Sequence, residues 1–196
     1  ISFGSKYPGE VRARSARSGA APLLTLPAGF GSLRKTVSEA PMGKSAKRVE
    51  QAAIAAGLEI DIITLPNSAH TAKAAAEALG CDVGQIVKSL LFEGQTTGAL
   101  KLVLVSGAHA LDLGRATEHF GEPLGRADPK RVRSETGFAI GGVAPIGHLC
   151  DIDTYMDDAL FQHATVWGAG GAPETVFAVA PDALLKATQA KRFTNG

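Results

Sequence analysis

One lysine stands in the middle of an apolar segment and is the first residue with an evident chemical use. Residues 86–92 read Ile-Val-Lys-Ser-Leu-Leu-Phe, a composition typical of a buried β-strand. Because strand side chains alternate between two faces, Lys88 shares a face with Ile86 and Leu90. An ammonium group there needs an anion, a carbonyl or water, since an unpaired buried charge is costly. Lys88 is a candidate catalytic cation; the alternative is an amine that extends past the strand end to solvent.

A glycine-rich segment is the second candidate site. It follows an expected short strand at 138–140 and consists of Gly141, Gly142, Val143, Ala144, Pro145, Ile146 and Gly147, with His148 directly after it. Without Cβ atoms, such a backbone can bring its N–H groups close to a ligand and stabilise a carbonyl or a developing oxyanion. An ordinary tight connection is the alternative for the loop. His148 could act as a base or donor, or be an ordinary surface histidine.

Two helix-related features are further candidates. Thr71 is the expected N-cap of a helix, and the functional alternative is that this helix start, with His70, lines the pocket. A basic cluster is either a solvated helix face or a contact for an RNA backbone: Arg126, Lys130, Arg131 and Arg133.

Several other kinds of site are excluded by spacing. The histidines lack metal-binding spacings such as HExxH, and neither a GxSxG serine, a Walker A loop nor a dinucleotide fingerprint is present. The stretch Asp151, Asp153, Asp157 and Asp158 lacks calcium-loop spacing and is expected to be a solvated turn.

Helices and strands of mixed order position these residues. Helices are expected at 49–56, 71–79, 112–120, 129–136 and from Pro181 onward, with glycines at most of their ends. Strands are expected at 58–62, 86–92, 100–105, 165–167 and 175–180. This order predicts an α+β domain around a mixed, curved sheet.

Composition sets the organisation of the chain. The 196 residues, 45% hydrophobic and 20% charged, suit one globular domain plus a tail. Residues 1–41 show no sustained period and are expected to be a disordered tail or a non-native extension, with a targeting peptide as the alternative; residues 42–196 form the domain. No run approaches the roughly 18 apolar residues of a membrane span. Cys81 and Cys150 form no CxxC pair, so a reducing cytoplasm is the expected location.

The charge is unevenly distributed. Residues 1–41 hold six Lys or Arg and two Asp or Glu, whereas residues 42–196 hold fourteen and seventeen. The domain is therefore not broadly basic, and contact with RNA would depend on a local patch.

Four segments in order carry a resemblance to a known family. They are the opening helix and strand through Leu65 with His70-Thr71-Ala72; residues 85–90 around Lys88; residues 136–148; and Gly170-Gly171 leading into Val176-Phe177 and residues 181–184. On these segments the chain resembles the YbaK/ProX family, the trans-acting relatives of the bacterial prolyl-tRNA synthetase editing domain. Each segment alone is weak, but a lysine strand followed by a GxxxP loop at this separation is specific.

The resemblance implies a single α+β domain with a mixed, barrel-like sheet surrounded by helices. It also implies hydrolysis of mischarged aminoacyl-tRNA carrying a small amino acid, typically on tRNA for proline, without a metal or other cofactor. Lys88 matches the family's essential lysine, and Gly141 to Pro145 match the loop that holds the aminoacyl group. The resemblance points to these further substrate-binding residues: Ser89, Ile146, Gly147, His148, His70, Thr71 and Gly170. Ser89 departs from the Asn that some members carry, which puts substrate choice in doubt.

Two other functions stay open from the residues. One is a non-catalytic regulatory protein that binds a nucleotide or an amino acid in the same pocket. The other is a generic esterase, against which the missing Ser/His/Asp pattern counts. The expected partners are the acceptor end of aminoacyl-tRNA and a prolyl-tRNA synthetase, and no oligomeric state is predicted.

Overall fold

The computed structural model describes residues 43–66 and 69–195, which belong to one compact unit. The α-helices are α1 (Lys44–Ala55), α2 (Ala72–Leu79), α3 (Ala116–Phe120), α4 (Pro129–Thr136) and α5 (Pro181–Thr188). The strands are β1 (Ile62–Thr64), β2 (Val87–Gly94), β3 (Leu100–Ser106), β4 (Leu124–Arg126), β5 (Asp153–Asp157), β6 (Val166–Ala169), β7 (Thr175–Val179) and β8 (Lys191–Phe193). Short 3₁₀ helices span Val83–Gln85, Leu113–Arg115 and Asp158–Gln162. The expected tail, residues 1–41, lies outside the described residues.

Local signals fix the helix ends. Gly80, Gly121 and Gly137 follow α2, α3 and α4 with left-handed φ values of 66°, 79° and 76°, as expected for glycine after a helix. The Asp128 side chain accepts hydrogen bonds from two backbone N–H groups at the start of α4, and Pro129 takes the first position. These helices were predicted from the same signals.

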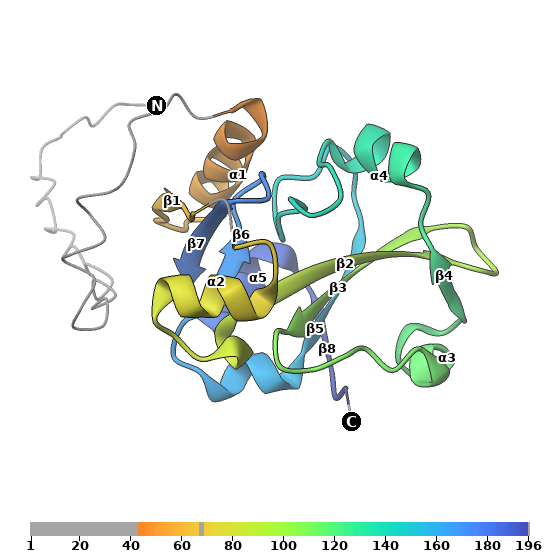
Figure 1. Cartoon of the computed structure of the whole chain (residues 1–196). Coiled ribbons are helices and arrows are strands. Elements are labelled where there is room, and N and C mark those ends of the chain that lie inside the picture. The colour runs from red at the N-terminus through yellow and green to blue at the C-terminus, as the bar shows by residue number, and fades with distance from the viewer. Residues whose placement is uncertain (1–42, 67–68, 196) are drawn as a thin grey trace, which may run out of the picture. The chain divides into compact units, whose positions relative to one another are not determined.

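The strands form two sheets (Figure 1). Three antiparallel strands have the order β1-β7-β6, and five strands have the order β4-β2-β3-β5-β8. In the larger sheet β2 is antiparallel to β3 and β4, whereas β3, β5 and β8 run parallel. The α+β class with mixed strands is confirmed. Among the described residues the sheet does not close into a barrel.

Three local expectations were wrong. The strand expected at 58–62 begins at Ile62, because pairing with β7 extends only from Ile62 to Thr64. Residues 138–140 form no strand, since the chain enters a loop directly after α4. The acidic stretch is not one solvated turn: Asp153–Asp157 form β5, which is paired on both sides, although Asp151 and Asp153 are exposed.

Two hydrophobic cores cover the two faces of the five-stranded sheet. The first core, which α1, α4 and α5 help to form, includes Val87 on β2, Leu102 and Leu104 on β3 and Met156 on β5. The second core includes Val103 and Val105 on β3, Tyr155 on β5, and Phe120 and Phe193, with Leu90 and Phe92 packed against it. Alternation along each strand therefore decides which face a polar side chain joins.

None of the helices in the described ranges has the length and apolar character needed to cross a membrane. The expected cytoplasmic location stays a prediction.

Candidate active site

Lys88 lies near the start of β2 on the face of the second core, with a half-buried side chain. Its ammonium group donates a hydrogen bond to the backbone carbonyl of His109 in the loop after β3. Burial lowers the pKa of the Lys88 amine, and the negative charge of Asp157 opposes that shift. A carbonyl and an anion are two of the partners that a lysine in this strand was expected to need.

Asp157 ends β5 and is the anion whose charge acts on this lysine. The residue is 1% exposed. Its Oδ1 accepts a hydrogen bond from the backbone N–H of Ala159 at 3.0 Å, and its Oδ2 accepts one from Ser106 at 3.3 Å. Nδ1 of His109 lies 3.4 Å from Oδ2 of Asp157. A buried carboxylate fixed by two backbone donors can therefore influence both Lys88 and His109.

The strand register explains why Lys88 and Asp157 share a face. Lys88 is paired with Val105 on β3, and the pairing of Leu104 with Met156 sets Asp157 beside Val105. Sequence reasoning missed Asp157 because the pairing of β3 with β5 is not visible in either strand alone. The alternation of Tyr155 and Asp157 around the buried Met156 was the available signal.

The start of α2 lies close to this region. Thr71 caps the helix, because its hydroxyl accepts a hydrogen bond from the Ala74 N–H at 3.1 Å. A Cβ added at Gly107 would lie 3.2 Å from the Cβ of Ala72 and 3.1 Å from that of Ile86. The helix start therefore lies beside the first residues of β2, and His70 is exposed there. A role of His70 and Thr71 in binding substrate stays a prediction.

The glycine loop packs against the other side of the sheet. Val143, Ala144 and Ile146 are buried members of the first core, and Pro145 is buried as well. Gly141 and Gly147 have left-handed φ values of 89° and 84°. These positions favour glycine because a Cβ would be strained there.

One loop amide that was expected to face a ligand already has a partner. The Gly142 N–H donates to the Ala139 carbonyl at 3.0 Å. A Cβ added at Gly142 would lie 3.0 Å from the backbone of Ala172 and Pro173, so the loop is in close contact with the segment that follows Gly170. Gly170 itself donates its N–H to the Thr175 carbonyl at 2.7 Å.

Arg48 on α1 holds both ends of this loop and was not predicted from the sequence. Its Nε donates to the Gly147 carbonyl at 2.7 Å, and its Nη2 donates to the Gly137 carbonyl at 2.9 Å. The guanidinium carbon lies 4.4 Å from the centre of the Phe138 ring. These contacts bridge about a hundred residues of chain and fix the path of the loop.

His148 is held in a neutral form at the end of the loop. Burial lowers the pKa of His148 to about 4. A hydrogen bond to the Ala144 carbonyl raises the pKa but does not offset the effect of burial. Its Nε2 is buried and has no hydrogen-bond partner among the described residues, and its ring packs edge-on against Phe138 at 5.5 Å. An imidazole that stays neutral at pH 7 can accept a proton or a hydrogen bond from a ligand.

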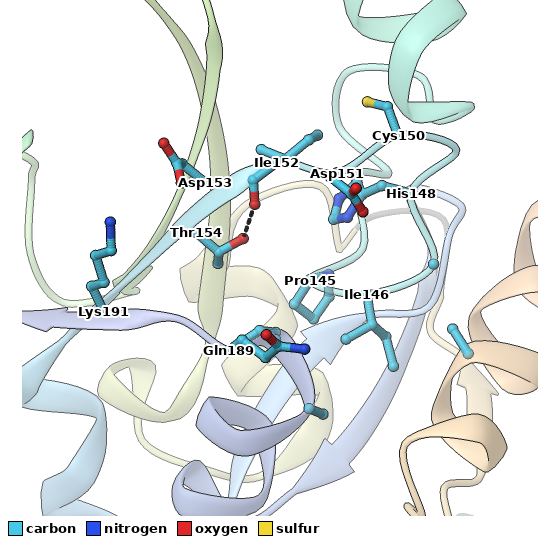
Figure 2. A pocket seen from close by; sticks show the side chains of 14 residues that line it. Pro145, Ile146, His148, Cys150, Asp151, Ile152, Asp153, Thr154, Gln189 and Lys191 are labelled. Atoms are coloured by element: carbon cyan, nitrogen blue, oxygen red, sulfur yellow. Dashed lines mark hydrogen bonds between the residues drawn. The ribbon is translucent and has the colours of Figure 1, made fainter.

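A pocket of about 400 Å³ lies beside the end of the glycine loop. Figure 2 shows the side chains that line it. Its walls come from four segments: Pro145–His148, Cys150–Thr154, Ala187–Gln189 with Lys191, and Ala52 of α1. Lys88 does not line this pocket. The pocket therefore belongs to the loop and the start of β5, and not to the lysine strand.

The predicted site residues thus fall into two groups. Lys88 faces the second core, whereas Ser89 and the apolar loop residues face the first core. The Ser89 hydroxyl is buried without a hydrogen-bond partner among the described residues. Within that part of the chain no hydrogen bond or ion pair joins Lys88 to residues 141–148. That the lysine and the loop line one substrate cavity stays a prediction.

The basic cluster is partly neutralised. Arg131 pairs with Glu93 at 3.0 Å and with Glu135 at 2.6 Å. Arg126, Lys130 and Arg133 are exposed. Within residues 43–66 and 69–195, no three His, Cys, Asp or Glu side chains lie close enough together to hold a metal ion. Metal-independent chemistry stays a prediction.

Comparison with known proteins decides the family. Residues 66–187 match the family model of the aminoacyl-tRNA editing domain. The chain belongs to this editing-domain family. The matched segment contains Lys88, the glycine loop, His109 and Asp157, and it confirms the resemblance that the four sequence segments suggested.

Relatives of this editing domain include proteins from two bacteria. The uncharacterised protein YwhH of Bacillus subtilis (strain 168) is 31% identical over 126 residues, which cover 64% of this chain and 80% of YwhH. EbsC of Enterococcus faecalis (strain ATCC 700802 / V583), a candidate Cys-tRNA(Pro)/Cys-tRNA(Cys) deacylase, is 29% identical over 119 residues, 60% of this chain and 72% of EbsC. The crystal structure of a candidate trans-editing enzyme for prolyl-tRNA synthetase is 46% identical, with a TM-score of 0.73, and covers 78% of this chain and 97% of that one.

Proposed function

We propose that the protein hydrolyses the ester bond of mischarged aminoacyl-tRNA that carries a small amino acid, on tRNA for proline. The observation that carries this proposal is the half-buried Lys88 ammonium, held by the His109 carbonyl inside a chain that belongs to the aminoacyl-tRNA editing family. The relatives described as a Cys-tRNA(Pro) deacylase and as a trans-editing enzyme for prolyl-tRNA synthetase support the same substrate class.

Hydrolysis of an aminoacyl ester requires only modest catalysis from the protein. An aminoacyl ester is already activated, so the site has to position water and stabilise the negative charge that develops on the ester oxygens. An ammonium group in a partly desolvated strand supplies such stabilisation more strongly than one in water, because screening is weaker there. In this proposal Lys88 binds the carbonyl oxygen or the oxygens of the terminal adenosine, and the glycine loop bounds the amino acid.

Size selection follows from sterics. In this proposal a small pocket admits small side chains and rejects bulky ones, as the second sieve of an editing enzyme does. The exposed Arg126, Lys130 and Arg133 provide a small basic surface for the tRNA backbone. A prolyl-tRNA synthetase that presents the tRNA would supplement this small surface.

A panel of charged tRNAs tests the proposal. The full chain is incubated with Ala-, Cys- and Ser-tRNA(Pro) and with correctly charged Pro-tRNA(Pro), and release of free amino acid is followed. We expect at least one small amino acid to be released well above the buffer rate. Dependence on the tRNA part of the substrate would distinguish this activity from a generic esterase.

The same experiment addresses the non-catalytic alternative. Binding of the charged tRNAs, or of the free nucleotide and amino acids, is measured on the same protein. Tight binding with no release above buffer for every member of the panel would replace the deacylase with a regulatory binding protein.

A further inference from the structure

His109 and Asp157 form a pair that the role of Lys88 does not by itself require. Nδ1 of His109 lies 3.4 Å from Oδ2 of Asp157, and the same histidine gives its carbonyl to the Lys88 ammonium. The three residues come from the loop after β3, the end of β5 and the start of β2. Three chemically useful groups are thus gathered at one end of the five-stranded sheet.

The pair is held in place by backbone contacts. The His109 N–H donates to the Ser106 carbonyl at 3.0 Å, which closes the turn after β3. The Asp157 carboxylate accepts backbone hydrogen bonds from Ser106 and Ala159, and its side chain is 2% exposed. The carboxylate therefore cannot turn away from the imidazole without losing these partners.

The imidazole itself can reach solvent. The His109 side chain is 42% exposed, and its Nε2 has no partner among the described residues. A carboxylate beside Nδ1 favours the tautomer that carries its proton there, which leaves Nε2 as an acceptor. This arrangement, a buried carboxylate behind an accessible imidazole, is the one that orients a histidine as a general base.

We propose that His109 is a catalytic general base for ester hydrolysis and that Asp157 is its positioning residue; the inference rests on the proposed function. Nε2 of His109 takes a proton from water while the water oxygen forms a bond to the ester carbonyl carbon. The oxyanion that forms is stabilised by the Lys88 ammonium. The bond between that carbon and the ribose oxygen then breaks, and the imidazolium returns its proton to the ribose oxygen. The products are the free amino acid and tRNA with its terminal hydroxyl restored.

The charges around His109 suit this sequence of steps. Lys88 from β2 and Asp157 from β5 are the charged groups that described contacts place against it. The neighbouring Asp158 is already paired with Arg192 at 2.7 Å. The negative charge of the Asp157 carboxylate stabilises the imidazolium as it forms. It also offsets the repulsion between that imidazolium and the Lys88 ammonium.

The test compares His109→Gln with the wild type and with His163→Gln, a control at a histidine outside the site. Single-turnover rates are measured between pH 5.5 and 8.5 on the substrate that the charged-tRNA panel identifies. Loss of a general base is expected to lower the rate by roughly 10²–10⁴-fold. The pH profile of the rate should differ between His109→Gln and the wild type, and binding of tRNA should be unchanged.

A chemical rescue separates a catalytic role from a structural one. Added imidazole should restore part of the rate in His109→Ala, but not in a Lys88→Ala variant. Asp157→Asn should lower the rate and move the acidic limb of the profile, and melting temperatures identify any variant that is merely unfolded.

The outcomes are distinguishable. A wild type that releases no amino acid refutes the proposed function itself. A wild type that hydrolyses the ester, together with a folded His109→Gln of equal rate and equal pH profile, overturns the role of His109 alone.

Discussion

A lysine side chain in the middle of a sheet loses hydrogen bonds to water, and the protein has to provide hydrogen-bond partners in their place. The Lys88 ammonium donates a hydrogen bond to the His109 carbonyl, and the negative charge of the buried Asp157 stabilises its positive charge. Burial lowers the pKa of this amine, so its positive charge depends on these partners more than that of a surface lysine does. The group is therefore positioned and electrostatically constrained before any substrate arrives.

The Arg48 side chain holds the glycine loop in place through hydrogen bonds to its backbone. It donates to carbonyls at both ends of the loop, Gly137 and Gly147, and stacks over the Phe138 ring. Lysine could offer neither the fork of donors nor the planar stack.

We therefore expect Arg48→Met to lower the free energy of unfolding by about 2 kcal/mol, the scale of losing hydrogen bonds from a charged group. Arg48→Lys should recover only part of that loss. Urea unfolding measures the stability. KM and kcat on the mischarged tRNA show whether the change in the loop affects the reaction. Lys47→Met, at an exposed position of the same helix, serves as the control. Equal stability of Arg48→Met and the control would mean that the loop is held by its apolar residues alone.

At the scale of elements, a buried acid joins the turn between β2 and β3 to the end of α3. Glu122 accepts hydrogen bonds from the backbone N–H groups of Thr96 and Thr97 at 2.9 Å each and from the Thr97 hydroxyl at 2.7 Å. Lys101 lies 3.2 Å from the same carboxylate. The hydrogen bonds from Thr97 are the largest cause that lowers the pKa of Glu122 to about 2.

This pKa sets a pH window for stability. A carboxylate whose pKa is depressed in the folded state stabilises the fold above its unfolded pKa of about 4.3 and loses that contribution as pH falls. We expect Glu122→Gln to melt below the wild type at pH 6, with the gap closing as pH falls from about 4 to about 2. Glu77→Gln, on the exposed face of α2, should melt like the wild type throughout. A gap that persists unchanged at pH 2 would contradict the role of the ionised carboxylate.

Elements with strong local signals could be predicted, and those that exist only through pairing could not. The helix ends at Gly80, Gly121 and Gly137 are local, since each glycine adopts a left-handed φ. By contrast β8 spans only three residues, two of them exposed and basic, and it forms because it pairs with β5.

The same division holds for the candidate site. Strand alternation around Lys88 is readable from residues 86–92 and predicts its need for a carbonyl or an anion. The identity of those partners, His109 and Asp157, depends on contacts between residues far apart in the chain. Asp157 was mistaken for part of a solvated turn because a buried carboxylate looks, in sequence, like any acidic residue.

At the scale of the whole described unit, the five-stranded sheet separates two polar regions. Lys88, His109 and Asp157 lie on the second-core side, and the glycine loop with His148 belongs to the first-core side. α1 and the segment after Gly170 hold the loop from outside, through Arg48 and through close backbone contact at Gly142. The substrate would have to reach the lysine at the end of the sheet, where β2 begins and α2 starts.

The single-turnover rate of a Lys88→Met variant on mischarged tRNA(Pro) tests the central claim most directly. Methionine keeps an unbranched apolar chain of similar length but removes the charge and the hydrogen bond to the His109 carbonyl. Lys186→Met, at an exposed position of α5, controls for loss of a lysine elsewhere. We expect the rate of Lys88→Met to fall by about 10²-fold or more, with the melting temperature and the circular dichroism spectrum preserved. A folded Lys88→Met that releases the amino acid as fast as the wild type would contradict the account.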